Sequence, residues 1–193
     1  MKVVIIKYNA GNIRSVTFAF ERIGINAVVT DNTDEIISAD KIIFPGVGEA
    51  STAMNYLKER KLDEVIVSLR QPVLGICLGM QLMCKFSEEG NTSCLGIFDQ
   101  KIVKFSDKLK SPQIGWNDIF DLKTELFKDM KGDEYMYFVH GYYAELSQNT
   151  IAKTNYGINY SSALQKNNFY GVQFHPEKSS EAGQKILENF LAL

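Results

Sequence analysis

Residues 72–84 read PVLGICLGMQLMC and join two apolar runs at a single cysteine. The first run is short and rich in Val, Leu and Ile, which is typical of a buried strand, and the second has the length and composition of a helix. Cys77 lies at the joint, with Gly75 before it and Gly79 after it. The stretch therefore predicts a strand that turns directly into a helix at Cys77.

Three more apolar runs precede this strand: VVIIKY at 3–8, NAVVT at 26–30 and KIIFPG at 41–46. They are nearly continuous rather than alternating, which is typical of strands buried on both faces of a parallel sheet. Helical patterns lie between them. Residues 12–24 place Ile13, Val16 and Phe20 on one stripe and end at Gly24, a C-cap, and residues 50–70 contain one or two more helices. This alternation predicts a doubly wound α/β sheet.

The second half of the chain predicts mostly antiparallel strands, with turns at 155–157 and 167–168 and a short helix around 123–132. The chain closes with an amphipathic helix whose N-cap is Ser179 or Ser180. The strands are expected within 96–105, 112–122, 134–146, 150–157 and 161–174.

Composition excludes several classes of protein. The chain has 193 residues, 45% hydrophobic and 23% charged, with a formal net charge of -2. We expect one soluble domain over 1–193 in the cytoplasm, without a membrane span, and the absence of a basic face argues against nucleic acid as a partner. Three cysteines and two histidines, without zinc-module spacing, predict neither a disulfide framework nor a metal site, and we expect no cofactor.

Cys77 has the setting of a nucleophile. The sequence G-x-C-x-G at a strand–helix joint has the form of a nucleophile elbow, with Cys in place of Ser. Such a thiol projects at the carboxyl end of the sheet and lies at a helix N-terminus, which favours the thiolate. The backbone N–H of Leu78 would then face an oxyanion. The alternative is a small buried side chain, the interpretation we keep for Cys84 and Cys94.

A nucleophilic thiol needs a base, and His175 is the better candidate. Glu177 follows two positions later, across Pro176, and in an extended segment the two side chains point the same way. Glu177 can therefore hold one tautomer of the imidazole, although a chance surface pair is the alternative. His140 has no neighbouring acid and is expected in the pocket wall. A second oxyanion donor is expected in the loop at 44–50, FPGVGEA, unless that loop is only a turn.

These motifs together resemble the class I, triad-type glutamine amidotransferases. The resemblance spans essentially the whole chain, in order, through PGVG, GICLGMQ, PQIGWN, YFVHGYY and GVQFHPEKSS. It implies a flavodoxin-like fold, with a central, mostly parallel sheet flanked by helices and antiparallel strands in the second half. It also implies hydrolysis of L-glutamine to glutamate and ammonia by a Cys77–His175–Glu177 triad. The ammonia would pass to a separate cyclase subunit in a heterodimer.

The resemblance assigns further roles. The backbone N–H groups of Val47 and Leu78 would form the oxyanion hole, and the Val47 group is expected to point away until the partner is occupied. Glu89 could pair with the α-ammonium group of glutamine, although a solvated surface charge is the alternative. The other substrate contacts implied are Gly48, Gln81, Gly141 and Tyr142. The residues implied at the contact with the partner are Asn12, Trp116 and Lys178.

Two other functions stay open on the sequence. One is a glutaminase that serves a different synthase, for example in sugar amidation or pyridoxal phosphate synthesis; PQIGWN argues against the latter. The other is a catalytically silent regulator with the same fold. Intact Cys77, His175 and Glu177 argue against silence.

Overall fold

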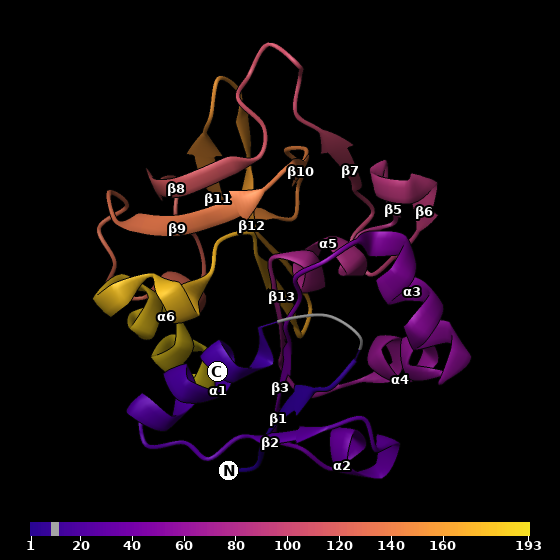
Figure 1. Ribbon diagram of the computed structural model, residues 1–193. Helices are drawn as coiled ribbons and strands as arrows, with labels where there is room; N and C mark the ends of the chain where they lie inside the picture. Colours follow the sequence, from indigo (N-terminus) through magenta and orange to yellow (C-terminus); the bar gives the residue numbers. More distant parts are fainter. Residues whose placement is uncertain (9–11) are drawn as a thin grey trace.

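A computed structural model describes residues 1–8 and 12–193 (Figure 1). Its main sheet has the strand order β2-β1-β3-β4-β13-β12-β10-β7-β5-β6, with β11 paired to β12. The pairs β2–β1, β1–β3, β3–β4 and β4–β13 are parallel, which is the order of a flavodoxin-like sheet. These five strands are β1 Val3–Ile6, β2 Val28–Thr30, β3 Lys41–Phe44, β4 Val73–Ile76 and β13 Phe169–Val172.

The strands beyond β13 form a largely antiparallel extension, as the sequence predicts. Within it only β5 and β7 pair in parallel among the described strands. A separate two-stranded ribbon, β8–β9, lies above the parallel strands and in front of β11 in Figure 1. The extension and the ribbon consist of β5 Phe86–Ser87, β6 Thr92–Ser93, β7 Lys101–Lys104, β8 Gln113–Asp118, β9 Tyr135–His140, β10 Tyr142–Ala144, β11 Thr150–Asn155 and β12 Asn159–Lys166.

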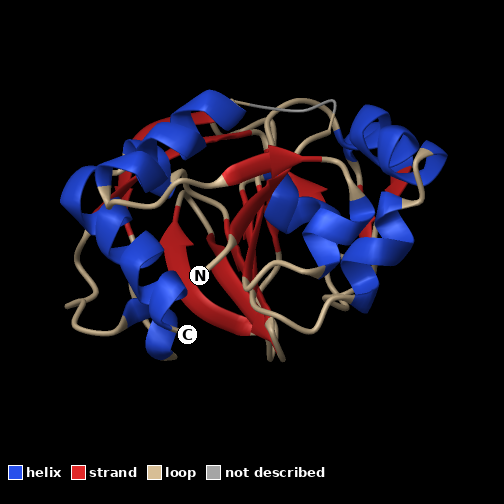
Figure 2. Ribbon diagram, turned by 90° about the horizontal axis from the view of Figure 1, so that it is seen from below, coloured by secondary structure: helices blue, strands red, loops and turns tan. Residues whose placement is uncertain are grey.

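Helices cover both faces of the parallel sheet (Figures 1 and 2). Helices α1 and α6 pack on one face, and α2 to α5 pack on the other, each group with its own apolar cluster. No helix among the described residues is long and apolar enough to cross a membrane. The helices are α1 Ile13–Arg22, α2 Thr33–Ile37, α3 Ala50–Glu59, α4 Leu62–Ser68, α5 Leu78–Met83 and α6 Ser180–Ala192, with short 3-10 helices η1 Glu89–Asn91, η2 Glu125–Phe127 and η3 Pro176–Lys178.

The continuous apolar run of β1 is explained by burial on both faces. Val4 and Ile6 belong to the cluster under α2 to α5, whereas Val3 and Ile5 belong to the cluster under α1 and α6. Successive side chains of a strand point to opposite faces, so both faces demand apolar residues. The same expectation is wrong for β2, which is an edge strand with Val28 39% exposed.

Strand β13 brings the end of the chain to the centre of the sheet. The prediction of mostly antiparallel pairing does not hold for it, because β13 is parallel to β4 as well as antiparallel to β12. Val172 lies opposite Ile76, and the N–H of Cys77 donates to the Val172 carbonyl at 2.8 Å. The residues that follow β13 therefore lie beside those that follow β4.

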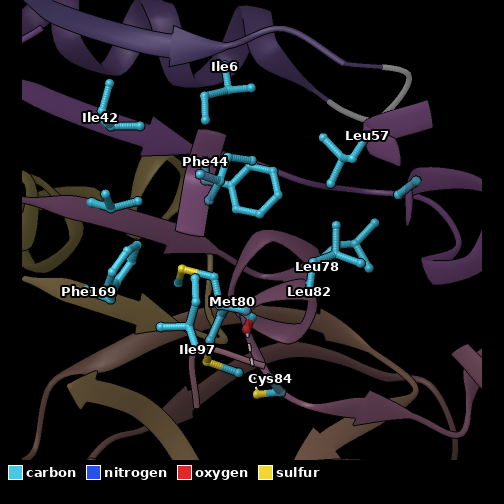
Figure 3. Packing of buried hydrophobic residues seen from close by; sticks show 14 of the residues in the cluster. Ile6, Ile42, Phe44, Leu57, Leu78, Met80, Leu82, Cys84, Ile97 and Phe169 are labelled. Atoms are coloured by element: carbon cyan, nitrogen blue, oxygen red, sulfur yellow. Dashed lines mark hydrogen bonds between the residues drawn. The ribbon is translucent and has the colours of Figure 1, made fainter. Parts of the chain in front are cut away.

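Helix α5 is buried along its whole length. Figure 3 shows Leu78, Met80 and Leu82 pointing into the cluster that also holds Phe44 of β3. Cys84 lies in the same cluster with none of its surface exposed, and its Sγ donates to the Met80 carbonyl at 3.7 Å. Cys84 is therefore a core side chain, as expected, and its burial raises the pKa of the thiol.

Helix α6 begins where the sequence places its cap, but the cap side chain has a different task. Ser179 occupies the N-cap position without a side-chain cap bond. Its hydroxyl donates to the His175 carbonyl at 2.6 Å and accepts from the Tyr137 N–H at 2.9 Å. Ser179 thus ties the start of α6 to the His175 segment and to β9.

Candidate active site

Cys77 lies between the last residue of β4 and the first of α5, in a strained backbone conformation with φ 52° and ψ -109°. A non-glycine residue keeps such angles only where its surroundings impose them. The flanking glycines are part of that constraint. A Cβ at Gly79 would lie 1.9 Å from the Phe44 carbonyl oxygen, and one at Gly75 would lie 2.8 Å from the Met80 nitrogen. The elbow therefore requires glycine on both sides of the thiol.

His175 and Glu177 form a buried pair directly after β13. The His175 Nδ1 lies 2.8 Å from Glu177 Oε1, and the two side chains are 3% and 2% exposed. A carboxylate only accepts hydrogen bonds, so Nδ1 carries a proton and Nε2 is the ring nitrogen left to exchange a proton with another group. Pro176 starts the turn of η3 that places the carboxylate beside the ring.

The imidazole and the Cys77 thiol line the same cleft. Burial alone would lower the pKa of His175, but hydrogen bonds and charge interactions with Cys77 and Glu177 outweigh it and raise this pKa to about 10. An imidazole with this pKa holds a proton taken from a thiol, because an opposite charge on each side favours its charged form. The three side chains that the sequence predicts as a triad are thus brought together.

The triad opens into a cleft of about 290 Å³. Its size suits a small polar molecule. Cys77 itself is only 6% exposed, but it lines this cleft together with His175. All the predicted oxyanion and substrate residues also line it: Val47, Gly48, Leu78, Gln81, Glu89, Gly141 and Tyr142.

Glu89 contributes a partly buried carboxylate to the cleft. One of its oxygens accepts the Ala50 N–H, at the first residue of α3, at 2.9 Å. Burial raises the pKa of Glu89, the Ala50 N–H opposes that shift, and the nearby Glu49 adds to it. Among the described residues, the other carboxylate oxygen makes no hydrogen bond or ion pair, and the side chain lines the cleft.

The two predicted oxyanion donors belong to segments that already touch. The Leu78 N–H donates to the Gly46 carbonyl at 3.3 Å. The Gly46 carbonyl and the Val47 N–H are opposite sides of one peptide group, so Val47 directs its N–H away from Leu78 in this arrangement. A rotation of this peptide would release Leu78 and turn the Val47 N–H toward it.

Two of the predicted partner residues, Lys178 and Asn12, line hollows that the triad also lines. The third, Trp116, packs on the same Tyr137 ring as Lys178. Trp116 is 53% exposed on β8, and its ring centroid lies 5.9 Å from that of Tyr137. The Lys178 ammonium lies 5.8 Å from the same Tyr137 ring and also lines the cleft. Asn12 lies with His175 and Glu177 around a small hollow behind the triad. Trp116 is therefore a surface side chain and not part of the core, where a lone Trp is often found.

Sequence reasoning missed Gln173 and Val139. Gln173 is fully buried and donates to Cys77 Sγ at 3.6 Å. It precedes His175 by two positions, and this extended i, i+2 spacing could have indicated that both side chains point to the same face. The Val139 carbonyl faces the sulfur at 3.7 Å, and only the pairing of distant strands places it there. His140 lines the cleft, as expected, and burial lowers its pKa to about 4, so it is neutral.

Comparison with known proteins agrees with this geometry. The family model "Glutamine amidotransferase class-I" matches residues 4–193. The chain is 58% identical to imidazole glycerol phosphate synthase subunit HisH of Bacteroides fragilis, over 100% of both chains. It is 47% identical to the HisH of Haemophilus influenzae, over 99% of this chain and 97% of that one.

A solved structure shares the fold at low sequence identity. A glutamine amidotransferase known from its crystal structure superimposes with a TM-score of 0.78 at 17% identity, covering 100% of this chain and 98% of that one. One conclusion follows from the parallel sheet, the elbow at Cys77 and the sequence similarity to HisH proteins along the whole chain. The chain belongs to the class I glutamine amidotransferases and, among them, to the family of imidazole glycerol phosphate synthase subunits HisH.

Proposed function

We propose that the chain is the glutaminase subunit of an imidazole glycerol phosphate synthase. It hydrolyses L-glutamine to glutamate and ammonia in the cleft at Cys77. The observation that carries the proposal is the strained Cys77 in one cleft with His175, which Glu177 orients at 2.8 Å. A nucleophile, a base and a group that orients the base are the requirements for covalent amide hydrolysis.

The chemistry proceeds in two halves. His175 takes the proton of Cys77, and the sulfur attacks the side-chain amide carbon of glutamine, forming a C–S bond. The C–N bond then breaks, and the proton on His175 passes to the leaving nitrogen, which departs as ammonia. Water, deprotonated by His175, attacks the resulting thioester. The C–S bond breaks, glutamate leaves and the thiol is restored.

Substrate recognition uses the walls of the cleft. Glu89 pairs with the α-ammonium group of glutamine through its free oxygen. Gln81 and the backbone of Gly48, Gly141 and Tyr142 contact the rest of the amino acid. This combination of one carboxylate and several neutral polar groups suits a zwitterion of small size.

Ammonia passes to the cyclase subunit HisF, a (β/α)₈ barrel that makes imidazole glycerol phosphate and aminoimidazole carboxamide ribotide in histidine biosynthesis. Trp116, Lys178 and Asn12 lie at the contact with this partner. The half-exposed Trp116 is suited to a binding hot spot, where Trp is enriched. We place the heterodimer in the cytoplasm, where this biosynthesis takes place.

The Gly46–Val47 peptide couples the two subunits. With the Leu78 N–H bonded to the Gly46 carbonyl, the oxyanion hole lacks both of its donors. Binding of HisF and its nucleotide favours the rotated peptide, so each site biases a shared state. Removal of a single oxyanion donor costs about 10²–10³ in rate.

The test compares glutamine turnover by the isolated chain with turnover by the complex with HisF and its nucleotide. We expect the complex to be faster by at least about 10²-fold, since the rotation restores the donors. Glutamate release is measured directly, with HisF alone as the control for contaminating glutaminase. Equal turnover by the isolated chain and the complex would contradict the coupling, and no turnover in either would contradict the proposed function.

A further inference from the structure

Besides His175, a second side chain lies next to the sulfur of Cys77: the buried amide of Gln173. It follows β13 directly and has none of its surface exposed. Its Nε2 lies 3.6 Å from Cys77 Sγ, within hydrogen-bonding range for sulfur. The triad mechanism does not use this contact.

The orientation of this amide is fixed by a chain of hydrogen bonds. Gln81 Nε2 donates to the Tyr142 carbonyl at 3.0 Å and to Gln173 Oε1 at 2.9 Å. A backbone carbonyl only accepts, so the Gln81 amide must direct its NH₂ group toward Tyr142 and Gln173. Gln173 must then present its oxygen to Gln81 and its NH₂ group to the sulfur. The Tyr142 carbonyl, through Gln81, thus fixes the Gln173 NH₂ group as a donor to the sulfur.

The two protonation states of the sulfur have different partners. The thiol can donate to the Val139 carbonyl, 3.7 Å away, whereas the thiolate can only accept, and Gln173 is placed to donate to it. A hydrogen bond donated to the thiolate stabilises this charged form relative to the thiol.

The other titratable groups near the sulfur leave His175 as its charged partner. Burial raises the pKa values of Tyr8 and Tyr160, so both phenols stay neutral, and His140 is neutral with its pKa lowered to about 4. Glu89 and Lys178 also line the cleft; they are present in every variant below.

We propose that Gln173 is a second hydrogen-bond donor to the Cys77 thiolate, and that Gln81 is a positioning residue that fixes the direction of this donor. The inference rests on the proposed function, in which the thiolate attacks glutamine. It gives Gln81, a wall of the substrate cleft, a second role: the side chain that meets the substrate also holds the amide that stabilises the nucleophile.

The test is the pH dependence of Cys77 alkylation by iodoacetamide in the full chain, since only the thiolate reacts. Gln173→Met keeps the length of the side chain and removes the donor. We expect its acid limb to move to higher pH by about one unit, equivalent to about tenfold slower alkylation below the midpoint. Gln81→Met, which does not touch the sulfur, should move the limb in the same direction by less.

Gln165→Met is the matched control, because Gln165 lies on the neighbouring β12 and binds the Tyr170 hydroxyl at 3.1 Å, away from the cleft. Its profile should equal that of the wild type, and Cys77→Ala supplies the background from Cys84 and Cys94. An unchanged profile in Gln173→Met would overturn the proposal, and an unchanged profile in Gln81→Met would overturn the relay.

The alkylation assay separates this inference from the proposed function because it needs no glutamine. Circular dichroism shows whether Gln173→Met folds. If it does not, Gln81→Met still tests the proposal, because Gln81 fixes the orientation in which Gln173 donates to the sulfur. A shifted acid limb, together with no glutaminase activity in the complex with HisF, would support the role of Gln173 and reject the proposed function. Glutaminase activity with an unshifted limb would do the reverse.

Discussion

Cys77→Ala is expected to abolish glutaminase activity while the complex with HisF keeps its cyclase activity on added ammonium salt. Removal of the nucleophile ends covalent catalysis, and in other triad enzymes such a change costs on the order of 10⁶ in kcat. The cyclase reaction uses ammonia however it is supplied, so it needs only a folded partner. Both reactions are measured on the same purified complex.

Cys94→Ala is the control for this experiment. Cys94 is half-buried, outside the cleft, and burial raises the pKa of its thiol to about 11, so the thiol is protonated at neutral pH. This variant should keep both activities. Loss of both activities in Cys77→Ala would show that Cys77 has a structural role, and full glutaminase activity would show that the nucleophile is elsewhere.

Glu177→Gln is expected to reduce glutamine turnover by about 10²–10⁴, with little change in the ammonium-dependent reaction. The substitution keeps the shape of the side chain but removes the charge that fixes the Nδ1–H tautomer and stabilises the imidazolium; the corresponding change in a serine protease costs about 10⁴. The exposed Glu181, in the first turn of α6, offers a matched Glu181→Gln control that should behave as wild type. Equal turnover in the two variants would remove Glu177 from the triad.

The same variant has a signature in stability. Burial opposes the charge on His175, but contacts with Cys77 and Glu177 raise its folded-state pKa from 6.5 to about 10. A raised pKa contributes stability that is complete below 6.5 and is lost as the pH rises toward 10. The free energy of unfolding should therefore separate wild type from Glu177→Gln most at acidic to neutral pH, and the difference should shrink toward pH 10 in urea titrations. A difference that grows with pH would contradict the charged pair.

Local rules predicted the elbow and the central sheet. The apolar run of β1 and the G-x-C-x-G joint depend only on neighbouring residues and on burial of both faces of a strand. The same local rules cannot tell an edge strand from a central one, so Val28 looked as buried as Val4. They also cannot show that β13 pairs with β4, because that pairing depends on segments far apart in the chain.

The chemistry of the site was predictable where one segment carries it. His175 and Glu177 are two positions apart, which indicated their contact, but the expected extended segment is wrong: only His175 is extended, and the 3-10 turn η3 that begins at Pro176 places Glu177 beside the ring. Gln173 and Gln81 meet only through the pairing of β13 with β4, and no spacing in the sequence indicates it. The bond from the Leu78 N–H to the Gly46 carbonyl is likewise a contact between distant segments, the start of α5 and the loop after β3.

The central claim is that the Cys77 sulfur attacks glutamine in this cleft, and covalent labelling tests it most directly. The complex with HisF is incubated with a diazoketone analogue of glutamine, which alkylates a nucleophile that is oriented toward the amide carbon. The account predicts, by peptide mass spectrometry, one label on Cys77, loss of glutaminase activity in step with labelling, and protection by glutamine. Inactivation with Cys77 unlabelled, or a label at Cys94 instead, would contradict it.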